Sequence, residues 1–216
     1  MFLTNSQPYS QVKNKKQSSL IFSLGMGIDY GATPSYTDYL RNELPVSARD
    51  SIKTFSTGIE FFGGIAYEFA KNISVKLDYS YFIRSNSYSF IYYVFDYTIT
   101  SHQPYLMIFY NLKNPKYTFK FGAGGGFHLY KLENNVNTSN TIGYTANGFS
   151  FRGEVIFGPK LSKNLETYIS GFVFASSTSS LKDSNGSLLK GTSTGKEVNL
   201  GGYGVGARLG LSFYLN

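Results

Sequence analysis

The sequence contains neither cysteine nor tryptophan, and it has no long apolar run. Without cysteine the chain can form no disulfide framework, no zinc ribbon and no thiol nucleophile. No segment approaches the ~18 consecutive apolar residues that a membrane-spanning helix needs. Residues 1–17 lack the apolar core of a secretory signal, so an export signal would have been removed, replaced or placed upstream. These absences exclude a disulfide scaffold and a helical membrane protein, and they leave the compartment open.

Aromatic residues and glycine are abundant instead. The 216 residues include 19 tyrosines, 19 phenylalanines and 23 glycines, although the mean hydropathy is slightly negative at -0.17. This combination favours all-β structure with closely packed strands. The length suits one large β domain or two small ones. The formal net charge is +7, and the positions of the charges decide what it means.

The C-terminal stretch Val198–Asn216 carries the clearest pattern. Every second residue from Tyr203 to Leu215 is apolar, and the residues between them are mostly small or polar. A period of two predicts a strand with one apolar and one polar face. The pattern lasts about twice as long as a typical soluble strand and exceeds the ~9–11 residues that cross a bilayer at a tilt. Such a strand needs a closed barrel, because unpaired backbone groups in lipid each cost several kcal/mol.

The same period appears seven more times along the chain. Two of the segments, 101–112 and 165–176, have apolar residues at both parities, so the sequence leaves their facing ambiguous. The predicted strands cover residues 18–31, 55–69, 73–85, 101–112, 117–132, 147–160, 165–176 and 198–216.

Long and short connections alternate strictly between these strands. Tight turns are expected near residues 71, 114 and 163, where Asn and Pro supply turn chemistry. Long loops are expected over residues 32–54, 86–100, 133–146 and 177–197, the last a mobile one and the second compatible with strand extension. An outer-membrane barrel segregates its connections in this way. We therefore predict an all-β fold, a closed antiparallel eight-stranded up-and-down transmembrane β-barrel over residues 18–216, preceded by a polar tail over residues 1–17.

Charged residues on the polar faces of the strands are predicted to line the lumen. A barrel of eight strands is only wide enough for side chains to fill, and buried charges must be paired. Acids and bases occur in nearly equal number, which predicts an internal salt-bridge network instead of a pore lining. For Arg208 the candidate partners are Glu60, Glu68 and Asp29. The predicted lumen residues are Asp29, Glu60, Glu68, Lys76, Asp78, Arg84, Lys120, Arg152, Glu154 and Arg208, with Glu166 depending on the facing of its strand.

The excess of basic residues falls in the tail and at the short turns. These lysines would form a rim on the short-turn side, which is periplasmic in an outer-membrane barrel. The rim could attract phospholipid head groups or an acidic partner, or consist of solvated turn residues. Nucleic acid is not expected, because no basic helix or aromatic-basic face is left over. The rim comprises Lys13, Lys15, Lys16, Lys71, Lys113, Lys116, Lys160 and Lys163.

No catalytic or cofactor motif emerges from the sequence. Of the two histidines, His128 is predicted to point into the lumen and His102 to lie at the interface. Ser101 precedes His102 directly, but neighbours on a strand point to opposite sides. The glycine-rich run 122–126 lacks the Lys-Ser/Thr of a phosphate loop and is expected to make room for larger lumen side chains. We expect no enzyme activity, no cofactor and no metal site.

The chain resembles the OmpA/OmpX/opacity-type outer-membrane β-barrel family over about residues 18–216. The most specific match is the C-terminal pattern of Arg208, Gly210, Phe213 and Leu215, which is similar to that family's barrel-assembly signal; Asn216 departs from it, since many members end on Phe. The resemblance implies an integral protein of the bacterial outer membrane with periplasmic termini. It also implies outer-membrane lipids and the barrel-assembly machinery as partners, and other envelope proteins as candidates.

The role expected for such a protein is structural or interactive: a membrane anchor, adhesin-like loops or a subunit of an envelope complex. The first alternative is a narrow pore or the transport of small hydrophobic molecules. The second is a lipid-modifying enzyme, because enzymatic eight-stranded barrels exist.

Overall fold

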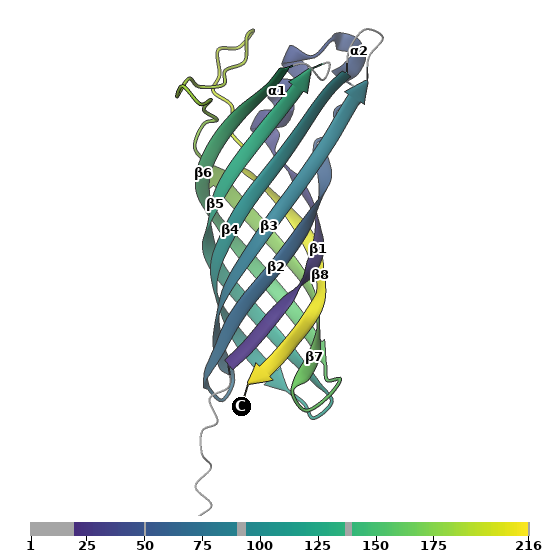
Figure 1. Ribbon diagram of the computed structural model, residues 1–216, viewed down its shortest axis with the longest axis vertical. Helices are drawn as coiled ribbons and strands as arrows, with labels where there is room; N and C mark the ends of the chain where they lie inside the picture. The colour runs from purple at the N-terminus through teal and green to yellow at the C-terminus, as the bar shows by residue number, and fades with distance from the viewer. Residues whose placement is uncertain (1–19, 50, 90–93, 137–139, 216) are drawn as a thin grey trace, which may run out of the picture.

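The computed structural model describes residues 20–49, 51–89, 94–136 and 140–215. Within these ranges the chain forms eight strands in one closed antiparallel barrel and two short helices (Figure 1). The strands are β1 (Leu20–Ala32), β2 (Phe55–Ala70), β3 (Ile73–Ser89), β4 (Val94–Lys113), β5 (Tyr117–Val136), β6 (Asn140–Pro159), β7 (Leu165–Thr178) and β8 (Gly202–Leu215). The helices are α1 (Pro34–Glu43) and α2 (Val46–Arg49).

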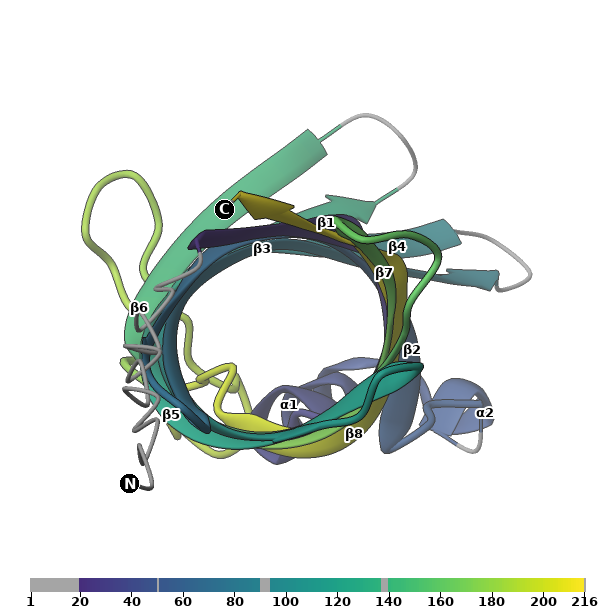
Figure 2. The same cartoon turned by 90° about the horizontal axis from the view of Figure 1, so that it is seen from below.

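Each strand pairs with its neighbour in sequence, and β8 closes the ring by pairing with β1. The closing ladder is antiparallel and runs from Leu20 opposite Leu215 to Ala32 opposite Tyr203. Viewed along the axis, the strands form a complete ring (Figure 2). The predicted fold class is therefore confirmed. The beginning of β1 and the end of β8 lie at the same end of the barrel, together with the short turns (Figure 1).

Strands β3 to β6 are longer than predicted. The expected loops 86–100 and 133–146 are largely strand, because β3 continues to Ser89, β4 starts at Val94, β5 continues to Val136 and β6 starts at Asn140. These four strands rise beyond the other four at one end of the barrel, here called the outer end (Figure 1). Apolar and polar residues continue to alternate through the extensions, but the apolar residues there lie on the opposite face of the strand. A pattern that assumes one constant apolar face therefore does not predict the extensions.

The predicted loop 32–54 contains α1 and α2, so this prediction was wrong. Pro34 occupies the first turn of α1, where its missing N–H is harmless. Tyr36 and Leu40 lie four residues apart and are both buried. One apolar stripe thus holds α1 against the outer end of the barrel. In the described part of the chain, neither helix has the length and apolarity needed to cross a membrane.

The segment between β7 and β8 is packed, not the mobile loop that its Ser-, Gly- and Lys-rich sequence predicted. Isolated bridges join Lys182 to Thr145 and Lys190 to Glu197. Leu181 and Leu200 are completely buried. The predicted last strand also begins later, at Gly202, because the residues just before it pack into the outer end instead of continuing the ladder.

The structure settles the facing of the two ambiguous strands. In β4 the odd-numbered side chains point inward, so Tyr105, Met107 and Phe109 lie in the lumen. In β7 the even-numbered side chains point inward, which places Glu166 in the lumen. Facing was ambiguous because the lumen accepts large apolar side chains where the neighbouring strand has glycine.

Glycines 122, 124 and 126 of β5 provide that space. They lie beside the large lumen residues of β4, and a Cβ atom at Gly122 would overlap the Phe109 ring. A Cβ at Gly126 would come within 2.7 Å of the Tyr105 ring. The glycine-rich run is therefore the packing complement of β4, as expected for glycines on the lumen side.

Candidate functional site in the barrel lumen

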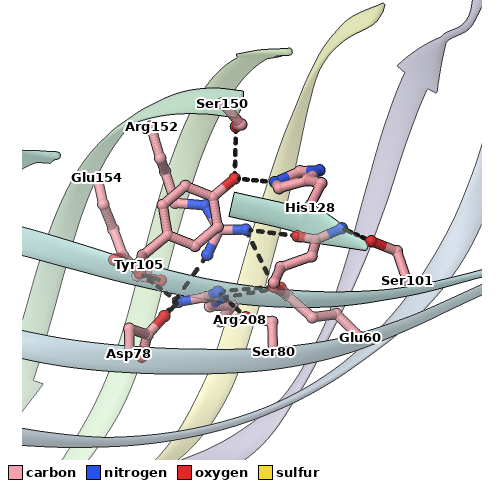
Figure 3. Close-up of polar contacts among 12 residues, drawn as sticks. Glu60, Asp78, Ser80, Ser101, Tyr105, His128, Ser150, Arg152, Glu154 and Arg208 are labelled. Atoms are coloured by element: carbon pink, nitrogen blue, oxygen red, sulfur yellow. Dashed lines mark hydrogen bonds and ion pairs between the residues drawn. The ribbon is translucent and has the colours of Figure 1, made fainter. Parts of the chain in front are cut away.

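The lumen is organised around Arg208 of β8, which is almost completely buried (Figure 3). Its Nε and Nη2 donate to the two carboxylate oxygens of Glu60 at 2.8 and 2.6 Å. Its Nη1 donates to Oδ2 of Asp78 at 2.8 Å. A planar guanidinium suits this forked arrangement, because it presents several donors in fixed directions.

Arg152 of β6 binds the same acids from the other side. Its Nη2 lies 3.2 Å from Oε1 of Glu60, and its Nη1 lies 3.6 Å from Oδ2 of Asp78. Its guanidinium carbon lies 4.2 Å from the centre of the Tyr105 ring, within reach of a cation–π interaction. Lys76 completes the group with a 2.7 Å contact to Oδ1 of Asp78. We call Glu60, Lys76, Asp78, Arg152, Glu154 and Arg208 the central network.

The central network is balanced, with three acids and three bases. The third acid, Glu154, lies 3.4 Å from Nη1 of Arg208 and accepts hydrogen bonds from Tyr168 at 2.8 Å and Ser170 at 2.6 Å. Buried ion pairs are tolerated only when geometry and further hydrogen bonds offset desolvation. The network meets that condition in part, because Oε2 of Glu154 and Nε of Arg152 are buried without a hydrogen-bond partner among the described residues.

The other predicted lumen charges lie above and below this group. Asp29 pairs with Arg84 at 3.1 Å toward the outer end, and Glu68 pairs with Lys113 at 2.5 Å near the short turns. Asp29 and Glu68 were candidate partners of Arg208, and this part of the prediction was wrong. The structure joins Arg208 to Asp78 and Glu154 instead, because tilted strands set which residues share a level.

Lys120 is also buried, and it donates to Oη of Tyr214 at 3.2 Å. Tyr214 in turn donates to Oε2 of Glu166 at 2.6 Å. One tyrosine thereby connects β5, β7 and β8 at their ends near the short turns. Tyr214 is a lumen residue that the sequence search for charges did not find.

Buried apolar side chains share the lumen with these charges. Phe62, Met107, Phe109, Ile156 and their neighbours form a buried cluster within it. Above the central network lies a cavity of about 20 Å³, lined among others by Asp29, Glu60 and Arg84. That volume holds about one water molecule.

A second apolar cluster, here called the cap cluster, lies at the outer end. Its members come from α1, the segments that flank α2, the upper parts of β4 to β6 and the segment between β7 and β8: Tyr36, Leu40, Leu44, Ile52, Phe95, Tyr97, Ile99, Tyr130, Leu132, Ala146, Leu181, Leu189, Val198 and Leu200. Tyr36 donates a 2.9 Å hydrogen bond to Oδ1 of Asn134, and burial raises its pKa well above the usual value.

The two histidines have different surroundings. His128 is buried in the lumen, with Nε2 2.6 Å from Oη of Tyr105 and Nδ1 2.7 Å from Oη of Tyr130. Tyr105 also meets Oγ of Ser150 at 2.5 Å (Figure 3). His102 points outward, and its Nδ1 lies 2.6 Å from Oη of Tyr79. These contacts make tyrosine, not a carboxylate, the partner of each imidazole.

Among the described residues, no group of His, Asp and Glu side chains is arranged to hold a metal ion. The rim lysines of that part of the chain gather at the short-turn end: Lys71, Lys113, Lys116, Lys160 and Lys163. Lys113 pairs with Glu68, which brings an acid to the rim. Lys13, Lys15 and Lys16 lie outside the described residues.

The residues of the proposed assembly signal share β8 but not one face. Phe213 and Leu215 point outward and are exposed, whereas Arg208 points into the central network. Gly210 lies against the backbone of β1, where a Cβ atom would collide with Leu24. The assembly role of these residues stays a prediction, and the structure adds that all four lie in the ladder between β8 and β1 that closes the barrel.

No family model matches the chain, and the search of curated proteins finds no match. Solved structures do match. Neisserial surface protein A is 8% identical, with a TM-score of 0.51 over 90% of this chain and 96% of that one. Ail, the attachment invasion locus protein of Yersinia pestis, is 11% identical, with a TM-score of 0.51 over 92% and 99%. The outer membrane protein OprG from Pseudomonas aeruginosa is 13% identical, with a TM-score of 0.52 over 92% and 96%.

At these identities the likeness shows the fold alone. The chain has the fold of small outer-membrane β-barrel proteins, as the sequence resemblance implied.

Proposed function

We propose that this protein is an integral outer-membrane barrel that acts through its outer end, as an adhesin-like surface or a subunit of an envelope complex. Its lumen is solid and does not conduct. Its termini and short turns lie on the periplasmic side. The belt of outward apolar side chains around the strands supports insertion in a bilayer, because a soluble barrel keeps such residues inside.

The observation that carries the proposal is the filled lumen. The central network crosses the barrel from β2 and β3 to β6 and β8, so its charges are joined across the lumen by direct contacts. The cap cluster closes the outer end above it. A conducting pore needs a continuous aqueous path, and the cavity between these two layers holds about one water molecule. The lumen therefore supports a structural role better than a narrow pore.

The outer end supports an interaction role. The upper parts of β3 to β6 form a sheet that stands beyond the apolar belt and carries polar side chains on its outer face, such as Ser85, Asp96 and Glu133. The cap cluster holds this sheet in one shape, so a partner would meet a preformed surface. Ail, which shares the fold, was solved with the heparin analogue sucrose octasulfate. That analogy rests on fold alone.

The contacts of His128 support a structural account of the buried histidine. A nucleophilic serine would need a base that a third group orients. His128 contacts tyrosine hydroxyls on both sides, deep in a filled lumen. We therefore propose that the protein has no enzyme activity. Replacing His128 by Gln would leave lipid A unchanged in mass if this is right.

The test combines membrane fractionation with planar-bilayer recording. The protein should fractionate with the outer membrane, migrate heat-modifiably in detergent gels and give no stable unit conductance. Loss of the rim lysines, by Lys71→Gln, Lys116→Gln, Lys160→Gln and Lys163→Gln together, should weaken association with any co-purifying envelope protein and with anionic lipid. Stable conductance steps, or recovery in the soluble fraction, would overturn the proposal.

A further inference from the structure

Asparagine is followed directly by glycine twice in the sequence, at Asn147–Gly148 and at Asn185–Gly186. Such a pair is chemically labile, because the backbone nitrogen of the glycine can attack the amide carbon of the asparagine side chain. Any other residue after asparagine carries a Cβ atom that shields this nitrogen, whereas glycine leaves it open. The structure places one pair in an exposed turn and the other in the wall of the barrel.

The exposed pair lies at the tip of the segment between β7 and β8, which projects beside β6 at the outer end (Figure 1). Both Asn185 and Gly186 are exposed. The N–H of Gly186 donates to the backbone oxygen of Asp183 at 3.1 Å and closes a β-turn, with glycine at its last position and a φ of +83°. A Cβ atom at Gly186 would meet no atom within 4 Å, so the space beside this residue is open.

The side-chain amide of Asn185 is free to turn toward Gly186. The carboxylate of Asp183 holds the backbone of the turn, since its Oδ1 accepts from the N–H of Asn185 at 2.9 Å and from that of Ser187 at 2.8 Å. These bonds use the backbone of Asn185 and not its side chain. Among the described residues, no hydrogen bond to the Asn185 amide has to be broken before it can move.

The second pair lies in β6 and is held on every side. Gly148 is paired with β5 on one side and with β7 on the other. A Cβ atom at Gly148 would collide with the backbone oxygen of Ser177, so the neighbouring strand lies directly against this residue. The side chain of Asn147 is engaged as well, because its Oδ1 accepts a hydrogen bond from Oγ of Ser179 at 3.2 Å. A reaction here would require the ladder to open, which costs free energy.

We propose that Asn185 is a site of spontaneous deamidation in the folded protein, whereas Asn147 is protected. The nitrogen of Gly186 loses its proton and forms a bond to Cγ of Asn185. The bond between Cγ and the side-chain nitrogen breaks, and the amide leaves as ammonia with that proton. Water then opens the resulting cyclic imide at either of its carbonyl groups, which gives aspartate or isoaspartate. The reaction consumes only water.

The product changes the tip of the segment in two ways. A carboxylate replaces a neutral amide close to the carboxylate of Asp183, so like charges meet in the turn. Isoaspartate also lengthens the main chain by a methylene group, which shifts the N–H of Ser187 away from its acceptor. Leu181 and Leu189 are buried in the cap cluster on the two sides of the turn, so the change should not extend beyond the tip.

The experiment compares the two asparagines within one protein. The barrel is refolded in detergent micelles, kept for days at neutral or mildly alkaline pH, then unfolded and digested with trypsin. Cleavage after Lys182 and Lys190 releases residues 183–190, and Asn147 lies in a different peptide. Mass spectrometry detects the gain in mass, and isoaspartate splits the chromatographic peak. We expect Asn185 to convert about tenfold faster than Asn147, and faster at the higher pH because the attacking nitrogen must lose its proton.

The chain kept in urea before refolding is the matched control, because both pairs are then equally accessible and should convert at similar rates. Asn185→Ala should abolish the signal of the peptide 183–190 and leave that of Asn147 unchanged. Heat-modifiable migration before digestion shows that the barrel is still folded. Equal rates of the two asparagines in the folded barrel, or an Asn185 that stays unchanged in it, would overturn the inference.

Discussion

The two halves of the long strands have opposite polarity. In the half of β5 within the apolar belt, the outward residues include Phe127 and Leu129, and the inward residues include Lys120 and His128. In the outer half, Lys131 points outward and Leu132 is completely buried inside. In β4 the outer face changes in the same way, from Leu106 to Thr98. The inner face of β4 is apolar in both halves, with Met107 within the belt and Ile99 beyond it.

This inversion has a simple physical cause. Apolar side chains gain about 25 cal/mol for each Å² removed from water, whichever side of the sheet removes it. Within the belt a bilayer would cover the outer face, and the polar groups turn inward and pair. Beyond the belt the outer face meets water, and α1 with the segment after β7 covers the inner face. The level at which the faces exchange marks the expected membrane boundary on the outer side.

The largest effect should come from breaking the pairing inside the belt. Arg208→Ala removes one of the two arginines that Glu60 and Asp78 share, and it leaves the buried network with more acids than bases. Losing one partner of a buried ion pair typically destabilises a protein by about 3–5 kcal/mol. We expect this loss, or failure to fold, in urea titrations followed by heat-modifiable migration.

The double variant R208M/E60Q is the control for this prediction. It removes the positive charge of Arg208 together with the negative charge of Glu60, so fewer unpaired charges stay buried. It should therefore recover part of the stability that Arg208→Ala loses. An Arg208→Ala barrel as stable as wild type would show that the central network is not needed to close the lumen.

The second-largest effect on stability should come from lysine substitutions on the two sides of the expected membrane boundary. Ile108→Lys places a charge on the outward face within the belt, which should cost about 2–4 kcal/mol at mid-membrane depth. Thr98→Lys makes the change on the same face of the same strand, beyond the exchange of faces and opposite Glu133. There the cost should be about 0–1 kcal/mol. Folding titrations in vesicles measure both, and equal costs would contradict the placement of the boundary.

The inversion also explains how far the sequence could be interpreted. The facing of β8 could be predicted because its outward residues are apolar, whereas its inward residues are glycine, serine, Arg208 and Tyr214. In β4 both faces carry apolar residues, since Met107 and Phe109 fill space left by glycines on β5. That signal lies on the neighbouring strand, so no pattern within β4 could give its facing.

The candidate site could also be predicted only in part, because facing follows from the sequence of one strand, whereas pairing depends on how the strands are arranged. Strand parity was enough to predict which charges point inward, including Asp29 and Arg84. It could not pair them, because the level of each residue depends on strand tilt and register around the ring. The helix α1 was missed for another reason. Its buried Tyr36 and Leu40 have helical spacing, but a ten-residue helix that begins with a proline gave too short a pattern.

A smaller effect is expected from the cap cluster alone. Tyr36→Phe removes one hydroxyl and leaves Oδ1 of Asn134 without its donor. The loss should be about 1 kcal/mol, the usual net value of one hydrogen bond. It should appear as faster proteolysis of the outer end, while the barrel keeps its heat-modifiable migration. Equal loss in both regions would show that cap cluster and barrel unfold as one unit.

The last prediction tests the cap cluster by pH. Burial, and then the nearby charge of Glu43, raise the pKa of Tyr39 to about 12. A raised pKa in the folded state means that the neutral phenol is favoured there. The associated stability is present below the unfolded value of about 10 and is lost as the pH rises toward 12. Near-ultraviolet absorbance should show tyrosine ionising in this range, together with loss of near-ultraviolet circular dichroism from the outer end.

The variant Y36F/Y39F provides the control for the pH titration. Tyr36 has its pKa raised by burial in the cap cluster, so the double variant should lose part of the late step. Tyr97 of the same cluster keeps the remainder, because burial raises its pKa as well. The heat-modifiable migration of the barrel should not change over the same range. A late step of unchanged size in Y36F/Y39F would assign it to other tyrosines and remove the pH-sensitive difference between the two regions.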